Sequence, residues 1–165
     1  FIQFFSFSKD CVHIEKFIDS GLSEDFHKNF YKFYGYEAEY TSIEELFTDI
    51  ENDTFFSIDI EGSEYGLLDK IVNSQSKLSG LVVELHNAHL NISRIENFIK
   101  NFELKLIHLH VNNYAEIQSG FPSVIELTFS RFAELTNNMV EILPNKLDQK
   151  NYEYGPNYSA TFNEE

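Results

Sequence analysis

Four short apolar runs in the middle of the chain predict the strands of a sheet. Each run is six to eight residues long, rich in Val, Ile, Leu and Phe, and bounded by polar or turn-forming residues. The runs span residues 55–60, 81–86, 104–111 and 124–129.

Apolar residues at helical spacing fill the two gaps between the first three runs. Residues 63–73 and residues 93–102 each carry apolar side chains one helical turn apart, and Ser93 with Glu96 forms a capping-box pattern in front of the second segment. A strand–helix–strand unit of this size joins parallel strands, so the first three strands are expected to run parallel.

The connection to the last strand is different. Residues 112–123 contain Gly120 and Pro122, show no helical period and are too few for a helical crossover. We therefore expect the strand at 124–129 to run antiparallel to its predecessor, which gives an α/β fold with a mostly parallel sheet.

The pattern is weaker outside this region. It favours a strand over residues 1–8, a surface helix over 24–34, and a short helix that follows a capping box of Ser42 and Glu45. We expect one domain over residues 1–165, divided into an N-terminal strand with helices (1–50), the α/β part (55–131) and an extended tail (132–165).

The amino-acid composition argues against some classes of binding partner. The chain has 12 Lys and Arg against 27 Asp and Glu, a net charge of −15, and a pI near 4.7. Such a surface repels phosphate backbones and anionic lipid, which argues against nucleic acid and membranes as partners. The single Cys11 excludes an intramolecular disulfide framework, and the residues after Phe1 do not form the basic, apolar and small-residue arrangement of a signal peptide, so a cytoplasmic protein is expected. Because the chain begins with Phe1, we expect a fragment of a longer protein.

Polar side chains gather where the parallel strands end. An open parallel sheet binds ligands beyond the carboxyl ends of its strands, because loops and helix N-termini form a crevice there. We therefore expect two or three of these side chains to converge on one pocket, where a carboxylate and an imidazole would shift each other's pKa toward general base catalysis. The residues are Asp59, Glu61, Glu84, His86, His108 and His110.

Structural roles are the alternative for each of these residues. Asp59 and Glu64 could simply cap the following helix, and His86 taken alone is more often a hydrogen-bonded structural histidine. The pair His108 and His110, followed by Asn112, is less easily explained as part of a core.

Four ordered segments resemble the C-terminal half of the FkbM family of S-adenosylmethionine-dependent methyltransferases. The most specific is the Asp-x-Glu-Gly-x-Glu element within FFSIDIEGSEYGLLDKI, and the others are LVVELH, LIHLHVNN and SVIELTFSR. The tail sequence LPNKLDQKN is similar to the end of the same branch. Together the similarity covers about residues 40–155.

The resemblance implies a Rossmann-like class I methyltransferase sheet of which this chain holds the fourth to seventh strands, the last one antiparallel and inserted beside its neighbour. It places Asp59 beside the transferable methyl, as a cofactor-binding and catalytic residue, with Glu61 and His86 also catalytic. It implies that Glu84, His108, His110 and Asn112 bind the substrate.

The cofactor half of such a sheet is not visible in the sequence. The seven glycines form no Gly-x-Gly, and only about fifty residues precede the strand at 55–60, too few for three strand–helix units of about thirty residues each. We expect the sheet to be incomplete at the N-terminus.

The leading hypothesis is O-methylation of a sugar or other small polyhydroxylated metabolite by S-adenosylmethionine, with Asp59 or His86 as the base and with no metal ion. One alternative is a metal-dependent enzyme, because His108-x-His110 with Glu116 is similar to the cupin histidine motif, although Phe102 stands where that motif has glycine. Another is a non-catalytic methyltransferase remnant that serves as an interaction module. Formation of a homo-oligomer stays open.

Overall fold

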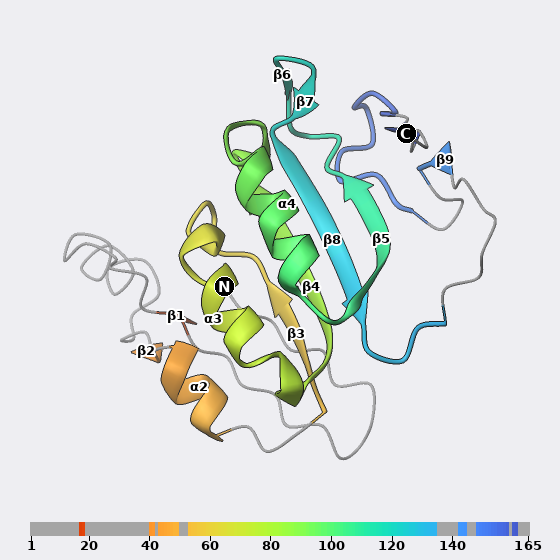
Figure 1. Cartoon of the computed structure of the whole chain (residues 1–165). Coiled ribbons are helices and arrows are strands. Elements are labelled where there is room, and N and C mark those ends of the chain that lie inside the picture. The colour runs from red at the N-terminus through yellow and green to blue at the C-terminus, as the bar shows by residue number, and fades with distance from the viewer. Residues whose placement is uncertain are drawn as a thin grey trace.

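The structure is a computed structural model of the chain (Figure 1). The predicted strand at 1–8 and helix at 24–34 lie outside the described residues, and so does Ser42. The structure describes residues 17–18, 40–41, 43–49, 53–134, 142–144, 148–158 and 160–161.

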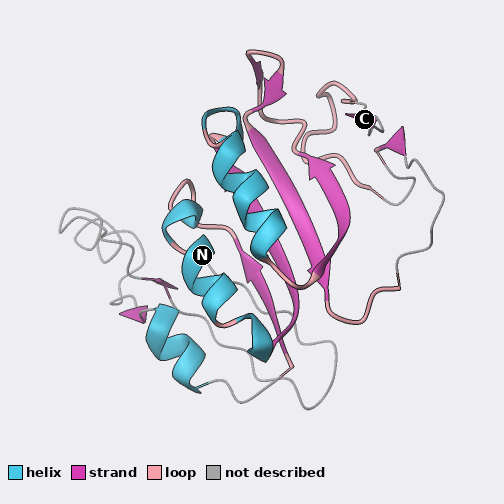
Figure 2. Cartoon of the chain, viewed as in Figure 1, coloured by secondary structure: helices cyan, strands magenta, loops and turns pink. Residues whose placement is uncertain are grey.

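A four-stranded mixed sheet forms the centre of the fold (Figure 2). Its spatial order is β3 (Thr54–Ile58), β4 (Leu78–His86), β8 (Val124–Ser130) and β5 (Lys105–Val111). β3 pairs with β4 in parallel, and β8 runs antiparallel to both of its neighbours. The predicted antiparallel last strand is thus confirmed. β4 and β5 run in the same direction but do not pair, because β8 lies between them.

Helices connect the strands as the spacing predicts. The chain leaves β3 through the 3-10 turn η1 (Glu64–Gly66) into α3 (Leu68–Asn73), and the 3-10 turn η2 (Gln75–Lys77) leads into β4. After β4, the 3-10 turn η3 (Ala88–Leu90) precedes α4 (Ile92–Asn101).

The predicted capping box in front of α4 is wrong. The helix begins earlier, because the carbonyl of Asn91 already accepts the N–H groups of Arg94 and Ile95, at 2.9 and 3.0 Å. Ser93 therefore lies inside the first turn, where its hydroxyl cannot act as the N-cap.

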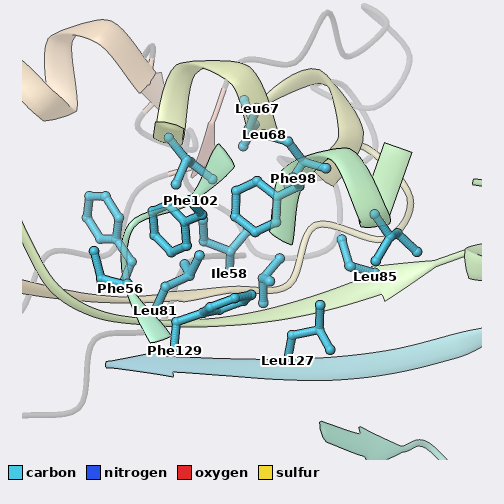
Figure 3. Packing of buried hydrophobic residues seen from close by; sticks show 14 of the residues in the cluster. Phe56, Ile58, Leu67, Leu68, Leu81, Leu85, Phe98, Phe102, Leu127 and Phe129 are labelled. Atoms are coloured by element: carbon cyan, nitrogen blue, oxygen red, sulfur yellow. The ribbon is translucent and has the colours of Figure 1, made fainter. Parts of the chain in front are cut away.

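The hydrophobic core lies on one face of the sheet (Figure 3). Phe98 of α4 and Phe102, which directly follows the helix, stack at 4.9 Å between ring centroids, and both meet Phe129 of β8 edge-on. The short helix α2 (Ile43–Asp49) joins the same core through Phe47, whose ring lies 5.1 Å from that of Phe56. Aromatic contacts of this kind tie α2 and α4 to a single face of the sheet.

The opposite face of the sheet is polar. Along β4 the residues alternate, so that Val83 and Leu85 are buried under the helices while Glu84 and His86 point to the other side. No helix of the described part of the chain covers this second face (Figure 1). The polar side chains of neighbouring strands therefore share one surface.

An irregularity in β5 keeps two histidines on that surface. The register of β5 against β8 shifts between Leu106 and His108, where the half-exposed Ile107 bulges out. Leu106 and Leu109 consequently both pack on the core, while His108 and His110 face the polar side.

Part of the C-terminal tail is fastened to the end of β5. The buried amide of Asn113 donates to the carbonyls of Tyr152 and Pro156, at 2.8 and 3.2 Å, and accepts the N–H of Tyr152 at 2.9 Å. One side chain thereby supplies the hydrogen bonds that a neighbouring strand would provide, and it places residues 148–158 beside β5.

The remaining elements are short. β6 and β7 form a hairpin whose turn residues Ser119 and Gly120 have φ values of 53° and 82°, the geometry that two-residue hairpin turns require. No helix among the described residues has the length and apolarity to cross a bilayer. The short strands are β1 (Phe17–Ile18), β2 (Tyr40–Thr41), β6 (Ile117–Gln118), β7 (Phe121–Pro122), β9 (Ile142–Leu143) and β10 (Ala160–Thr161).

Candidate functional site

A row of ionisable residues crosses the polar face of the sheet. Glu84 of β4 lies directly opposite Glu126 of β8, which in turn lies opposite His110 of β5. Asp59 follows directly after β3 and lies next to Glu84, since Ile58 pairs with Val83. The row therefore reaches across all four strands.

Three of the predicted residues form one group at the carboxyl ends of β3 and β4, which we call the strand-end cluster. It consists of Asp59, Glu84 and His86, each with a ligand atom within 4.8 Å of the others. The side chains of Glu84 and His86 are half-buried. The expected convergence of carboxylates with an imidazole holds for these residues.

The turn after β3 is built around Glu64. Glu61 and Gly62 have positive φ values of 53° and 101°, and the chain doubles back so that Glu64 Oε1 accepts the N–H groups of Ile60 and Gly62, at 3.3 and 2.9 Å. The Glu64 side chain is fully buried. This explains the Asp-x-Glu-Gly-x-Glu spacing physically, because glycine adopts the left-handed conformation without strain and the last Glu caps the turn.

His86 lies between two glutamates of that turn. Its Nδ1 is 3.0 Å from Glu64 Oε1, and its Nε2 is 3.3 Å from Glu61 Oε2. The hydrogen bond to Glu64 raises the pKa of His86, burial opposes this, and the charges of Glu64, Glu61 and Glu84 add to the rise. A carboxylate at each ring nitrogen favours the imidazolium.

Glu64 carries the negative charge in its contact with His86. Burial by itself would raise the pKa of Glu64, but the hydrogen bonds from His86 and from the backbone of the turn outweigh it, so the pKa lies below its ordinary value. The strand-end cluster thus rests on a contact between the buried Glu64 and the half-buried His86, which holds the imidazole ring in place.

Glu84 lies in a different environment from Glu64. Burial and the negative charge of Asp59 raise the pKa of Glu84, although Asn112 Nδ2 donates to its Oε1 at 2.7 Å. Glu126, directly across on β8, adds further repulsion. Glu84 therefore takes up a proton more readily than an isolated glutamate.

His108 and His110 belong to a second group, which we call the tail cluster. Asp148 contacts both rings, with Oδ1 at 2.8 Å from His108 Nε2 and Oδ2 at 3.6 Å from His110 Nδ1. These two histidines and Asp148 form a group whose ligand atoms all lie within 4.8 Å of one another. The structure thus divides the predicted residues between two clusters on the same face.

Sequence reasoning did not single out the acidic member of the tail cluster. Asp148 lies 38 positions beyond His110 in the chain, and it reaches β5 because contacts such as those of Asn113 hold the tail there. Its signal was the LPNKLDQKN segment, which similarity alone had marked. Glu116, the acidic residue considered with the two histidines, is exposed at the base of the β6–β7 hairpin and is not part of this cluster.

Two cavities lie near these elements. One of about 550 Å³ opens between α3 and α4, on the helical side of the sheet and away from the strand-end cluster. Another of about 310 Å³ is bordered by His110 and Asp148 together with Pro144, Gln149 and Tyr158. The second cavity gives small molecules a route to the tail cluster.

Comparison of the chain with models of protein families, with curated proteins and with solved structures finds no match. Function therefore has to be argued from the geometry of the two clusters and the sheet that carries them.

Proposed function

We propose that this chain carries the acceptor-binding half of a methyltransferase that uses S-adenosylmethionine to methylate a hydroxyl group of a sugar or a similar polyhydroxylated metabolite. The observation that carries the proposal is the position of Asp59, directly after β3 and within 4.8 Å of Glu84 and His86. This edge, beyond the carboxyl ends of parallel strands, is where open α/β sheets bind ligands.

The sheet supports the same proposal. The resemblance to the FkbM family implies a last strand that is antiparallel and inserted beside its neighbour, and β8 lies between β4 and β5, antiparallel to both. In that interpretation β3, β4, β5 and β8 correspond to the fourth to seventh strands of a Rossmann-like sheet.

Transfer to a hydroxyl needs a group that removes its proton. In the proposal this group is Asp59, because both ring nitrogens of His86 are already engaged by carboxylates, Nδ1 by Glu64 at 3.0 Å and Nε2 by Glu61 at 3.3 Å. His86 instead holds the turn after β3 in place, and the exposed Glu61 lines the acceptor side. Glu84 and Asn112, joined at 2.7 Å, offer an acceptor and a donor for the hydroxyls of the substrate.

The residues described do not form a complete site for the cofactor. The sequence has no Gly-x-Gly turn, and two N–H groups of the turn after β3 are taken up by Glu64. We therefore assign this chain the acceptor side only.

Calorimetry of the full-length natural protein with S-adenosylmethionine tests the proposal, followed by transfer of a labelled methyl group to a panel of sugars. We expect Asp59→Asn to lower the transfer rate about 100-fold or more, the usual scale for loss of a general base, with little change in cofactor affinity.

Asp53→Asn is the matched control, because Asp53 is exposed at the other end of β3 and asparagine tolerates its positive φ of 56°. No cofactor binding by the full-length protein, or equal rates for the two variants, would refute the proposal. Absence of cofactor binding would instead favour the interpretation of the chain as a non-catalytic interaction module.

A further inference from the structure

The tail cluster has the composition of a metal site. Two imidazoles from one strand face and one carboxylate from a separate segment converge at His108, His110 and Asp148. We propose that these three side chains bind one divalent transition-metal ion, at a site separate from the strand-end cluster and independent of the methyl-transfer proposal.

The distances between the candidate ligand atoms suit such an ion. Bonds of about 2.0–2.1 Å in a tetrahedral site place neighbouring ligand atoms about 3.3 Å apart. Asp148 Oδ1 lies 2.8 Å from His108 Nε2, and Asp148 Oδ2 lies 3.6 Å from His110 Nδ1, so the two distances fall on either side of that value. Small side-chain adjustments are enough to admit the metal.

A hydrogen bond at Nε2 of His110 orients the ring so that Nδ1 can bind the metal. Its Nε2 lies 2.8 Å from Asn151 Oδ1, an acceptor that calls for a proton on Nε2. In the neutral ring, Nδ1 then carries a lone pair that faces Asp148 Oδ2. Ligating histidines are typically held by a hydrogen bond of this kind from the nitrogen that does not bind the metal.

The carboxylate is carried by a segment with a fixed position. Asn113 makes three hydrogen bonds to Tyr152 and Pro156. Lys150 Nζ donates to the carbonyl of Gly155 at 3.1 Å, which closes the segment on itself. Asp148 and Asn151 therefore approach β5 together, one as a ligand and the other as its support.

The donor set favours particular metals. Imidazole nitrogen with carboxylate oxygen suits Zn²⁺, Fe²⁺, Mn²⁺ or Co²⁺, whereas Mg²⁺ and Ca²⁺ prefer oxygen alone. Three protein ligands leave at least one position for water or another small molecule. The cavity of about 310 Å³ bordered by His110 and Asp148 provides the room for it.

The competing explanation is a plain ion pair, in which Asp148 ties the tail to protonated histidines. The two explanations differ in what a chelator does. A metal site loses stability when the ion is removed and regains it on addition, while an ion pair does not respond.

The test uses the full-length protein made without a histidine tag, stripped with EDTA and dialysed. We expect Zn²⁺ titrated by calorimetry to bind in one equivalent, Co²⁺ to give visible absorption bands of a nitrogen- and oxygen-ligated site, and both metals to raise the melting temperature. Asp148→Asn and His108→Gln should weaken Zn²⁺ binding at least about 100-fold, and Asn151→Ala about 10-fold, the scale of a lost supporting hydrogen bond.

Two controls keep the result specific. His89→Gln changes a histidine outside both clusters, and Asp59→Asn alters the strand-end cluster, so both variants should bind Zn²⁺ like the original protein. Absence of binding, or binding that Asp59→Asn abolishes and His108→Gln leaves unchanged, would overturn the proposal. If Asp148→Asn fails to fold, the graded loss in Asn151→Ala and His110→Gln decides.

Discussion

Glu64 is a carboxylate that the fold has removed completely from solvent. It accepts hydrogen bonds from two backbone N–H groups and lies 3.0 Å from His86 Nδ1, so its charge is matched by donors and by a cation. Burial of a charge is costly unless it is paired in this way, and removal of one partner leaves the other uncompensated.

We therefore expect Glu64→Gln to destabilise the protein by about 2–4 kcal/mol near pH 6, because it removes the charge that pairs with His86 and weakens the hydrogen bonds that close the turn. Urea unfolding followed by circular dichroism measures the difference. Glu96→Gln, at an exposed position of α4, is the control and should change stability by less than about 0.5 kcal/mol.

The difference in unfolding free energy between the original protein and Glu64→Gln should depend on pH in a defined direction. The pKa of His86 is raised above its ordinary 6.5, so its contribution is complete below that pH and is lost as the pH rises through the raised value. The pKa of Glu64 is lowered below 4.5, so its contribution is present above that pH and is lost as the pH falls through the lowered value. The original protein should exceed Glu64→Gln most between about pH 4.5 and 6.5; a constant difference up to pH 9 would contradict the ion pair.

At the residue scale, the polar residues that close the apolar runs predicted part of the site. They placed Asp59, Glu84 and His86 at one end of the sheet, because the carboxyl ends of parallel strands lie at the same edge. They could not show that Glu64 and Glu61 flank His86, since that contact depends on the two positive φ values of the turn. Whether these residues act in methyl transfer stays a prediction.

At the scale of elements, the tail passes close to the residues that follow β5 at Gly155. A Cβ at this position would lie 2.7 Å from the backbone oxygen of Asn113 and 2.8 Å from its Nδ2. A backbone atom cannot move aside without displacing the end of β5. The absence of a side chain at Gly155 is thus what allows the tail to lie against β5.

We expect Gly155→Ala to cost about 1–3 kcal/mol, the usual scale of overpacking, and to loosen residues 148–158 selectively. Hydrogen exchange should show faster exchange in that segment and unchanged protection in β4 and β8. Gly66→Ala is the matched control, because a Cβ there meets nothing within 4 Å. Equal exchange in the two variants would mean that the tail is not held at this contact.

The elements themselves were largely predictable, and their edges less so. The four main strands and the two helices between them follow from local apolar period. β4 begins at Leu78 and not at the expected residue 81. Ser79 and Gly80 interrupt the apolar run in the sequence, although both lie within the strand and Gly80 pairs with Ser130. The parallel pairing expected between neighbouring strand–helix–strand units fails for β4 and β5, since order within a sheet depends on contacts far apart in the chain.

For the molecule as a whole, the large negative net charge dominates the electrostatics. A net charge of −15 makes self-repulsion in the compact state larger than in an ordinary domain of this size. The like charges of Glu84 and Glu126, directly opposite one another, show the same excess within the sheet.

Added salt should therefore stabilise the protein. Raising NaCl from 0.02 to 0.5 M at pH 7.5 shortens the screening length several-fold and should raise the free energy of unfolding by about 1 kcal/mol. Calorimetric melting at each salt concentration measures this. At a pH near the pI of 4.7 the effect should largely vanish, because the net charge is then small; the same rise there would show that screening is not the cause.

The insertion of β8 also has a consequence for how the chain is made. β4 and β5 each find their shared partner only in residues 124–130, so a chain still emerging from the ribosome exposes two unpaired strand edges until that segment appears. Truncation before residue 124 would leave these edges permanently open to other chains. The nascent protein thus depends on β8 to cover the edges of β4 and β5, which would otherwise be open to aggregation.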